Sequence, residues 1–175
     1  MKLRKEVFIM SIDITLRLLD KNGKFLTKDI YDGRNRKWFD NMSGKYTTDK
    51  AYDHLPIGYG TLGFFPNEWL QMEQDKDYFD FRYMSVKEYR DWYIKYNPSF
   101  QAGWVKKYTG FLMKYKGYIP EYGVDLYHEL DTEDIIEDMV WVEFHEKYDN
   151  STWLYNYLEE NNISDDAWIV YCFDC

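Results

Sequence analysis

The amino-acid sequence predicts an α+β fold: a mainly antiparallel sheet formed by an N-terminal hairpin and C-terminal strands, with several helices inserted between them. Strand-like segments lie at both ends of the chain, whereas helical spacing of apolar residues prevails in the middle. The segments that we expect to form one sheet, with helices packed on it, are Ser11–Leu19, Phe25–Tyr31, Met139–His145 and Ala167–Asp174.

The size and composition of the chain indicate a single globular domain. A chain of 175 residues can bury about 70% of its unfolded surface, and an aromatic content of 21% is not that of a disordered protein. We expect residues 10–175 to form this domain and residues 1–9 to be a translated leader or a disordered extension. Lys5-Glu6-Val7 is what a ribosome-binding sequence ahead of a Met10 start codon would encode. The alternative is that "VFIMSIDITL" forms one continuous edge strand.

The N-terminal hairpin is predicted from alternation and from its turn. Ser11–Leu19 is rich in β-branched and apolar residues, which is typical of a strand. Asn22-Gly23 suits the positive φ angles of a tight hairpin turn. Phe25–Tyr31 is therefore expected to return as the second strand.

A short helix is predicted next, starting near Asp32 or Asn35. The residues on its apolar face are Trp38, Phe39 and Met42. The following residues, 43–63, are rich in glycine and tyrosine and show no clear period. A loop of this length is either functional or contains an element that periodicity does not reveal.

Three signals bound the helices in the middle of the chain. Pro66 suits a first turn, because the N–H that it lacks would have no partner there. Ser85 and Glu88 have the spacing of a capping box, in which each side chain bonds the backbone N–H of the other residue. That helix is expected to end near Tyr96, ahead of Pro98.

A further helix is predicted from apolar residues that recur at helical spacing and form one stripe. The residues of this stripe are Trp104, Tyr108, Phe111, Leu112 and Tyr115. We expect the stripe to face the core and Gly117 to end the helix. Aromatic residues placed in this way are not expected to stack on nucleic-acid bases.

The last third of the chain should contain two helices and two strands. Asp131–Met139 and Asn150–Asn161 are predicted to be helices, and the acids at the start of the first suit its positive end. Met139–His145 is predicted to be a strand. Ala167–Asp174 is apolar on both faces, which is typical of an inner strand, so residues 168–171 should be largely buried.

The net charge of −9 is distributed unevenly along the chain. Residues 1–50 carry 12 Lys+Arg and 7 Asp+Glu, and residues 51–116 carry 9 and 8. Residues 117–175 carry one lysine and 16 acids, which gives 1 − 16 = −15. A surface of this charge can repel or imitate nucleic acid, or it can serve only to keep the protein soluble.

No catalytic or metal-binding motif can be assigned from the sequence. Cys172 and Cys175 are at best half of a zinc site, and His54, His128 and His145 are scattered, so we expect no metal. "GYGTLG" has the spacing G-x-G-x-x-G, but it does not connect a strand to a helix as a dinucleotide site must. We therefore expect no cofactor. No apolar run reaches the 18 residues that cross a bilayer, so a cytoplasmic protein is expected.

Short segments spread over the chain carry a resemblance. They are "MSIDI" at Met10–Ile14, Gly33-Arg34-Asn35 followed by Phe39, Leu55-Pro56 leading to Trp69, "YMSVKEYRDW" at Tyr83–Trp92, and the closing "IVYCFD". In these segments the chain resembles an uncharacterised family of small bacteriophage and bacterial proteins. The family commonly has two histidines where this chain has Phe79 and Phe81, so any metal or acid–base role of those histidines is absent here. The resemblance implies a phage or prophage context and names no activity.

The first of two hypotheses about function is a non-enzymatic one. The protein would be a phage- or prophage-encoded accessory protein that inhibits a host protein in the host cytoplasm, such as a nucleic-acid-binding defence factor, for example a CRISPR effector. Its acidic segment, Glu121–Asp149, would face a basic surface of that partner. The centre of this segment is formed by Glu133, Asp134, Glu137 and Asp138. Direct binding of nucleic acid or membrane is not expected.

The second hypothesis is a protein that binds or hydrolyses a small molecule such as a nucleotide. The region Tyr46–Gly63 would form the pocket with Arg34, Asn35 and His54, because an arginine and an asparagine after a strand can hold a phosphate. Arg34 and Asn35 can equally cap the helix that follows. Asp13 and Asp174 are assigned to the same pocket, where we expect them to anchor loops by accepting hydrogen bonds rather than to act as catalytic acids. A structural or morphogenesis role is the third hypothesis.

Overall fold

The computed structural model describes residues 12–45, 47, 50–98, 100–116, 138–145 and 150–174. These residues form seven strands and five α-helices, which confirms the α+β class. The strands are β1 (Asp13–Leu19), β2 (Tyr31–Gly33), β3 (Gly58–Tyr59), β4 (Tyr78–Ser85), β5 (Phe100–Lys106), β6 (Met139–His145) and β7 (Trp168–Asp174). The helices are α1 (Arg36–Met42), α2 (Asn67–Met72), α3 (Val86–Tyr96), α4 (Lys107–Lys116), α5 (Asn150–Glu160) and the 3₁₀ helix η1 (Lys50–His54).

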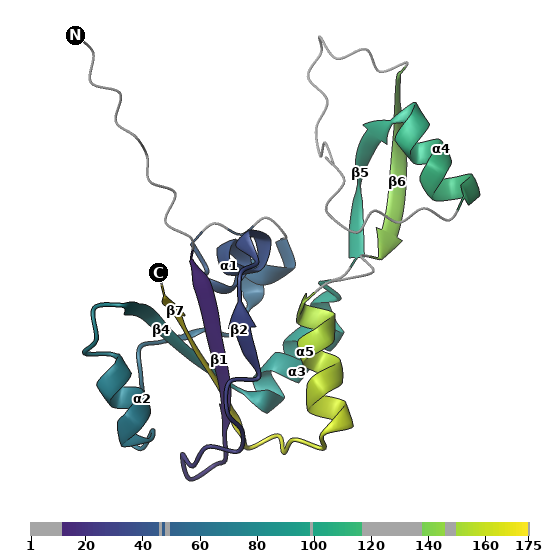
Figure 1. Cartoon of the computed structure of the whole chain (residues 1–175). Coiled ribbons are helices and arrows are strands. Elements are labelled where there is room, and N and C mark those ends of the chain that lie inside the picture. Colours follow the sequence, from purple (N-terminus) through teal and green to yellow (C-terminus); the bar gives the residue numbers. More distant parts are fainter. Residues whose placement is uncertain are drawn as a thin grey trace, which may run out of the picture.

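A five-stranded antiparallel sheet in the order β2-β1-β7-β4-β3 forms the centre of the molecule (Figure 1). The two ends of the chain lie side by side in it, because β1 pairs with β7 from Leu19↔Trp168 to Asp13↔Asp174. β7 is the middle strand, and all of its residues from Ile169 to Phe173 are fully buried. The prediction of an inner strand at the C-terminal end is therefore confirmed, although Trp168 itself is only half-buried.

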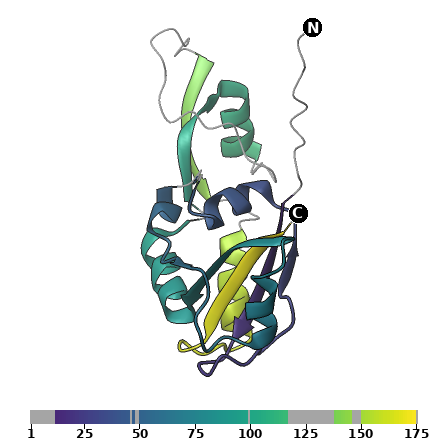
Figure 2. The ribbon, with the colours of Figure 1, turned by 90° about the vertical axis from the view of Figure 1, so that its left-hand side faces the viewer.

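The predicted place of β6 in this sheet is wrong. β6 pairs instead with β5 in a separate two-stranded sheet, in register from Phe100↔His145 to Lys106↔Met139. Figures 1 and 2 show this sheet and α4 apart from the five-stranded sheet, in a unit inserted between α3 and α5. Strand β5 was not predicted, because its Trp104 was assigned to a helix from the spacing of apolar residues. β5 pairs with β6 in antiparallel register over seven residues, and this pairing replaces the predicted one.

The second strand of the N-terminal hairpin also differs from its prediction. The return segment makes a single bridge, Leu19↔Phe25, and pairs regularly only from Tyr31, which lies opposite Leu16. From the first pair to the second, β1 runs three positions, from Leu19 to Leu16, whereas the return segment runs six, from Phe25 to Tyr31. The three additional residues leave the ladder, and this shortens the strand to Tyr31–Gly33.

Helices cover both faces of the five-stranded sheet. One face packs on α1, η1, α3 and α5, through a cluster that includes Met42, Tyr89 and Leu154. The opposite face packs on the region of α2, through Phe65 and Trp69. Figure 1 shows α2 on one side of the sheet and α3 and α5 on the other. Successive residues of β7 therefore belong to different clusters, and this accounts for a strand that is apolar on both faces.

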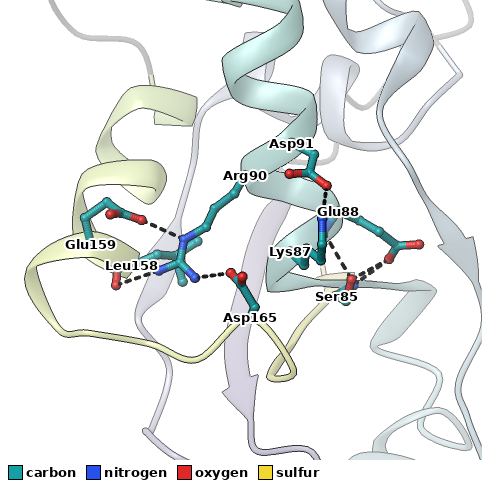
Figure 3. Close-up of polar contacts among 8 residues, drawn as sticks. All are labelled: Ser85, Lys87, Glu88, Arg90, Asp91, Leu158, Glu159 and Asp165. Carbon is teal, nitrogen blue, oxygen red and sulfur yellow. Dashed lines mark hydrogen bonds and ion pairs between the residues drawn. The ribbon is translucent and has the colours of Figure 1, made fainter.

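Two helix predictions are confirmed by the contacts that start the helices. Asn35 caps α1, its side-chain oxygen accepting from the N–H of Trp38 at 3.0 Å. Ser85 and Glu88 form the capping box of α3, as Figure 3 shows. α3 ends at Tyr96, followed by Asn97 in a left-handed conformation. The predicted loop at residues 43–63 contains two elements that periodicity did not reveal, η1 and β3.

Arg90 ties α3 to α5 and to the turn that follows it (Figure 3). Its guanidinium is 2.6 Å from Glu159 and 2.6 Å from Asp165, and it donates to the carbonyl of Leu158 at 3.4 Å. One side chain thus holds the end of α5 and the residues that lead into the central strand β7.

The predicted orientation of the aromatic stripe of α4 is wrong. Trp104 belongs to β5, and the helix begins only at Lys107. Tyr108, Phe111 and Tyr115 are 74%, 47% and 66% exposed, so they do not face a core. The predicted helix Asp131–Met139 lies outside the described residues except for its last two, and so do residues 1–9. None of the described helices has the length and apolar character needed to cross a bilayer.

Candidate functional site

Asp13 and Asp174 lie directly opposite each other at the ends of β1 and β7. Residues opposed in this way point to the same face of a sheet, so the two carboxyl groups are neighbours. Asp13 accepts from the guanidinium Nε of Arg34 at 2.7 Å, and Asp174 accepts from the hydroxyl of Thr15 at 3.0 Å. Three of the five residues assigned to the small-molecule pocket, Arg34, Asp13 and Asp174, are thus brought together.

The environment of Asp174 disfavours its charged form. Partial burial is the main cause that raises its pKa above the ordinary value. The hydrogen bond from Thr15 opposes this effect, whereas the negative charges of Asp13, Asp32 and Asp29 raise the pKa further. A carboxyl group with a raised pKa is a feature that catalytic acids and bases often share. In the described part of the chain, however, no three His, Cys, Asp or Glu side chains are grouped as a metal site would require.

Replacing Asp174 by Asn is expected to stabilise the protein at neutral pH. Because the pKa of Asp174 is higher in the folded than in the unfolded state, the folded protein retains a proton that the unfolded chain releases. The free energy of unfolding of the wild type therefore falls as pH rises from 3.8, the ordinary value, through the raised pKa. The amide oxygen of the variant still accepts from Thr15, and the loss of charge removes the cross-strand repulsion, a gain of about 0.2–1 kcal/mol. Urea unfolding at a series of pH values measures this difference.

Thr15→Val serves as the opposite variant. It removes the hydroxyl that stabilises the carboxylate of Asp174, so the fall in stability with pH should become steeper than in the wild type. If Asp174→Asn lost stability at every pH, the carboxylate would be held by stronger interactions than those of Thr15. The anchoring role of Asp174 would then outweigh its repulsion from Asp13.

The other two residues of the small-molecule hypothesis have structural partners. The side-chain oxygen of Asn35 is engaged as the cap of α1. The ring of His54 stacks on that of Tyr96, with centroids 4.5 Å apart and planes 6° from parallel. Among the described residues, no hydrogen bond or ion pair joins His54 to Arg34, Asp13 or Asp174. The five residues are therefore not linked into one polar cluster.

The described cysteine does not suit metal binding or nucleophilic chemistry. Cys172 is fully buried in β7, and this burial raises the pKa of its thiol to about 12. A thiol must lose its proton to bind zinc or to attack a substrate. Cys175, the other half of the C-x-x-C pair, lies outside the described residues.

Only the last residue of the predicted acidic centre belongs to the described chain. Asp138 is exposed and directly precedes β6. Glu133, Asp134 and Glu137 lie outside the described residues, as does His128. Within β6, Glu143 is exposed and accepts from the indole N–H of Trp141 at 3.3 Å.

A cluster that the sequence did not indicate lies around Arg82 in β4. The Arg82 side chain is only 6% exposed, and the ring of Tyr59 lies over its guanidinium carbon at 4.4 Å. Asp80 Oδ2 is 3.8 Å from Arg82 Nη2 and 2.5 Å from Lys45 Nζ. An arginine in a strand is normally taken for a surface residue, so only the three-dimensional structure reveals this cluster.

Comparison with known proteins identified no relative of this chain. No protein-family model matches the chain, and neither a curated protein nor a solved structure is significantly similar to it.

Proposed function

We propose that the protein is a phage- or prophage-encoded accessory protein that binds and inhibits a host protein in the host cytoplasm. The partner would be a nucleic-acid-binding defence factor, such as a CRISPR effector, whose basic surface receives an acidic, nucleic-acid-mimicking face of this chain. The proposal rests on one observation: residues 117–175 carry 16 acids and a single lysine.

The described acids of this region support a binding role because most of those on the surface pair with no described basic group. Glu159 and Asp165 pair with Arg90. Across the described ranges, the remaining exposed acids of this region form no ion pair. They are Asp138, Glu143, Glu160 and Asp166. Their mutual repulsion would be relieved by a partner rich in lysine and arginine, and complementary charge would also speed association.

The contacts around Asp13 and Asp174 support a non-enzymatic role. Each carboxylate accepts a hydrogen bond from a side chain of its own fold, and these bonds hold the loop after β2 and the end of β7. This arrangement accounts for the two residues without a substrate. Arg34 and His54 are accordingly given no ligand-binding role.

Reversing the charge of the acidic centre is expected to abolish binding. In the variant with Lys at Glu133, Asp134, Glu137 and Asp138, a change of +8 would replace attraction to a basic partner by repulsion. Affinity capture from host lysate with the wild type identifies the partner, and the variant should then retain none of it. Wild-type binding should weaken with added salt, compete with nucleic acid and survive chelators.

A second charge reversal separates a local site from a general effect of charge. Lys at the exposed acids Asp32, Glu73, Asp75 and Asp77 makes the same change of +8 outside residues 117–175. This control should keep most of its binding. If the first variant kept full biological activity, the acidic segment would contribute only to solubility and not to binding.

A further inference from the structure

A bulge in β4 lies directly before a buried arginine, Arg82. Between Phe79↔Phe173 and Arg82↔Tyr171, β4 advances by three residues and β7 by two. The additional residue coincides with Asp80, which has a φ of +53°. A left-handed conformation is unfavourable for a residue with a side chain, and bulges of this kind often redirect side chains next to functional sites.

Arg82 is buried, and one of its guanidinium nitrogens has no hydrogen-bond partner in the described part of the chain. Its Nη1 donates to the carbonyl of Phe81 at 3.0 Å, and its Nη2 is 3.8 Å from the carboxylate of Asp80, too long for a hydrogen bond. Its Nε has no hydrogen-bond partner anywhere in the described ranges. A buried N–H donor without an acceptor is costly. An unpaired donor of this kind indicates an acceptor that the protein chain itself does not supply.

The charges around Arg82 leave a positive surplus. Asp80 is shared, because its Oδ2 contacts both Arg82 and the ammonium group of Lys45. Two cations and one carboxylate amount to a charge of +1. The turn that carries Lys45 is held close to β7, since Tyr171, opposite Arg82, donates its hydroxyl to the carbonyl of Met42 at 2.9 Å.

An exposed aromatic ring covers the buried guanidinium. Tyr59 is 63% exposed and belongs to β3, a two-residue strand at the edge of the sheet. Its hydroxyl reaches to 3.0 Å from the point where a Cβ on Gly44 would lie, so the ring bridges the Lys45 turn and β4. Tyr59 is thus an exposed side chain on a short edge strand that covers Arg82, and exposed side chains change rotamer rapidly.

We propose that Arg82 and Lys45 form a binding site for a small oxyanion, a phosphoryl or carboxylate group. The carboxylate of Asp80 contacts both cations, and an incoming oxyanion displaces it to bind Lys45 together with the guanidinium of Arg82, whose Nε is unpaired. Arginine and lysine are the side chains that bind such groups by charge-assisted hydrogen bonds. The site is independent of the acidic segment and requires no catalysis.

Inorganic phosphate is the probe for this site. Titration of the ¹⁵N-labelled protein should shift the Nε–H resonance of Arg82, which Arg82→Lys identifies by its loss. Asp80→Asn should bind phosphate roughly tenfold more tightly, because the competing carboxylate is removed while Asn still tolerates a positive φ. Lys45→Met should bind roughly tenfold more weakly, because one charge-assisted hydrogen bond is lost.

Matched exposed residues control for general effects of charge. Lys76→Met and Asp77→Asn make the same chemical changes at exposed positions on the segment that leads into β4, and both should bind phosphate like the wild type. Sodium chloride at equal ionic strength should leave the Arg82 resonance in place. The proposal is overturned if phosphate does not shift this resonance in the wild type or in Asp80→Asn, or if Lys45→Met and Lys76→Met behave alike.

Discussion

Replacing Trp69 by Ala is expected to lower the free energy of unfolding by about 3–5 kcal/mol, because it removes the largest fully buried side chain on the α2 side of the five-stranded sheet. Trp69 is fully buried, and its ring lies 5.3 Å from that of Phe81 and 5.5 Å from the guanidinium carbon of Arg17. The short helix α2 and the adjacent Phe65 supply the helical cover of this face. The side chains around Trp69 are expected to relax only in part into the cavity.

A second tryptophan, which is partly exposed, is the control for this experiment. Trp153 in α5 is 38% exposed and packs against Tyr31, Trp38 and Tyr157. Trp153→Ala should cost about 1 kcal/mol, the typical effect of a point mutation. Urea unfolding followed by circular dichroism measures both variants. Equal losses of stability in the two variants would mean that the α2 side of the sheet does not unfold cooperatively with the rest of the protein.

The central strand could be predicted because its signal is local. A run that is apolar at both odd and even positions can be a strand only if both faces are covered. Val170 and Cys172 pack toward α2, whereas Ile169, Tyr171 and Phe173 pack toward the other helices. The caps of α1 and α3 were also predictable, because they depend on residues three positions apart.

Strand β4 could not be predicted because its pattern is broken by the bulge. The additional residue at Asp80 shifts the alternation of faces partway along the strand. Arg82 lies in the interior, where a periodicity argument expects an apolar residue. The cluster around Arg82 follows from this irregularity, so it is invisible in the sequence for the same reason.

The orientation of α4 shows a different limit of periodicity. The spacing of Tyr108, Phe111 and Tyr115 indicates correctly that they share a face, but it does not indicate which face is buried. α4 packs instead through Gly110, where an added Cβ would lie 2.3 Å from a methyl group of Val140. Close approach of the helix to β6 requires the smallest residue, and the large rings remain outside.

The proximity of Asp13 and Asp174 depends on strand pairing, which no local pattern determines. The N-terminal and C-terminal strands were expected in the same sheet, but their order and register come from the packing of the whole domain. The same limit explains the misplaced β6, since its sequence alone does not reveal whether its partner is β1 or β5.

Gly23 lies in the turn after β1 and is expected to tolerate no side chain. The carboxylate of Asp20 accepts from the N–H groups of Asn22 and Lys24, at 2.8 and 2.9 Å, and closes the turn. Gly23 adopts a φ of +79°, and a Cβ there would lie 2.2 Å from the carbonyl oxygen of Phe64. That oxygen is part of the backbone, so it cannot rotate away as the end of a side chain could.

Gly23→Ala is therefore expected to lower the free energy of unfolding by about 2–4 kcal/mol, through backbone strain together with displacement of the Phe64 segment. Two other glycines separate these causes. Gly60 has a φ of +90° with nothing within 4 Å of its Cβ position, so Gly60→Ala should show the strain alone, about 1–2 kcal/mol. Gly63 has neither a positive φ nor a close neighbour, and Gly63→Ala should leave stability unchanged or raise it by up to about 1 kcal/mol. Urea unfolding of the three variants should follow this order. A loss at Gly23 no greater than that at Gly60 would mean that the turn and the Phe64 segment move apart freely, and that the close approach does not contribute to holding this end of the sheet.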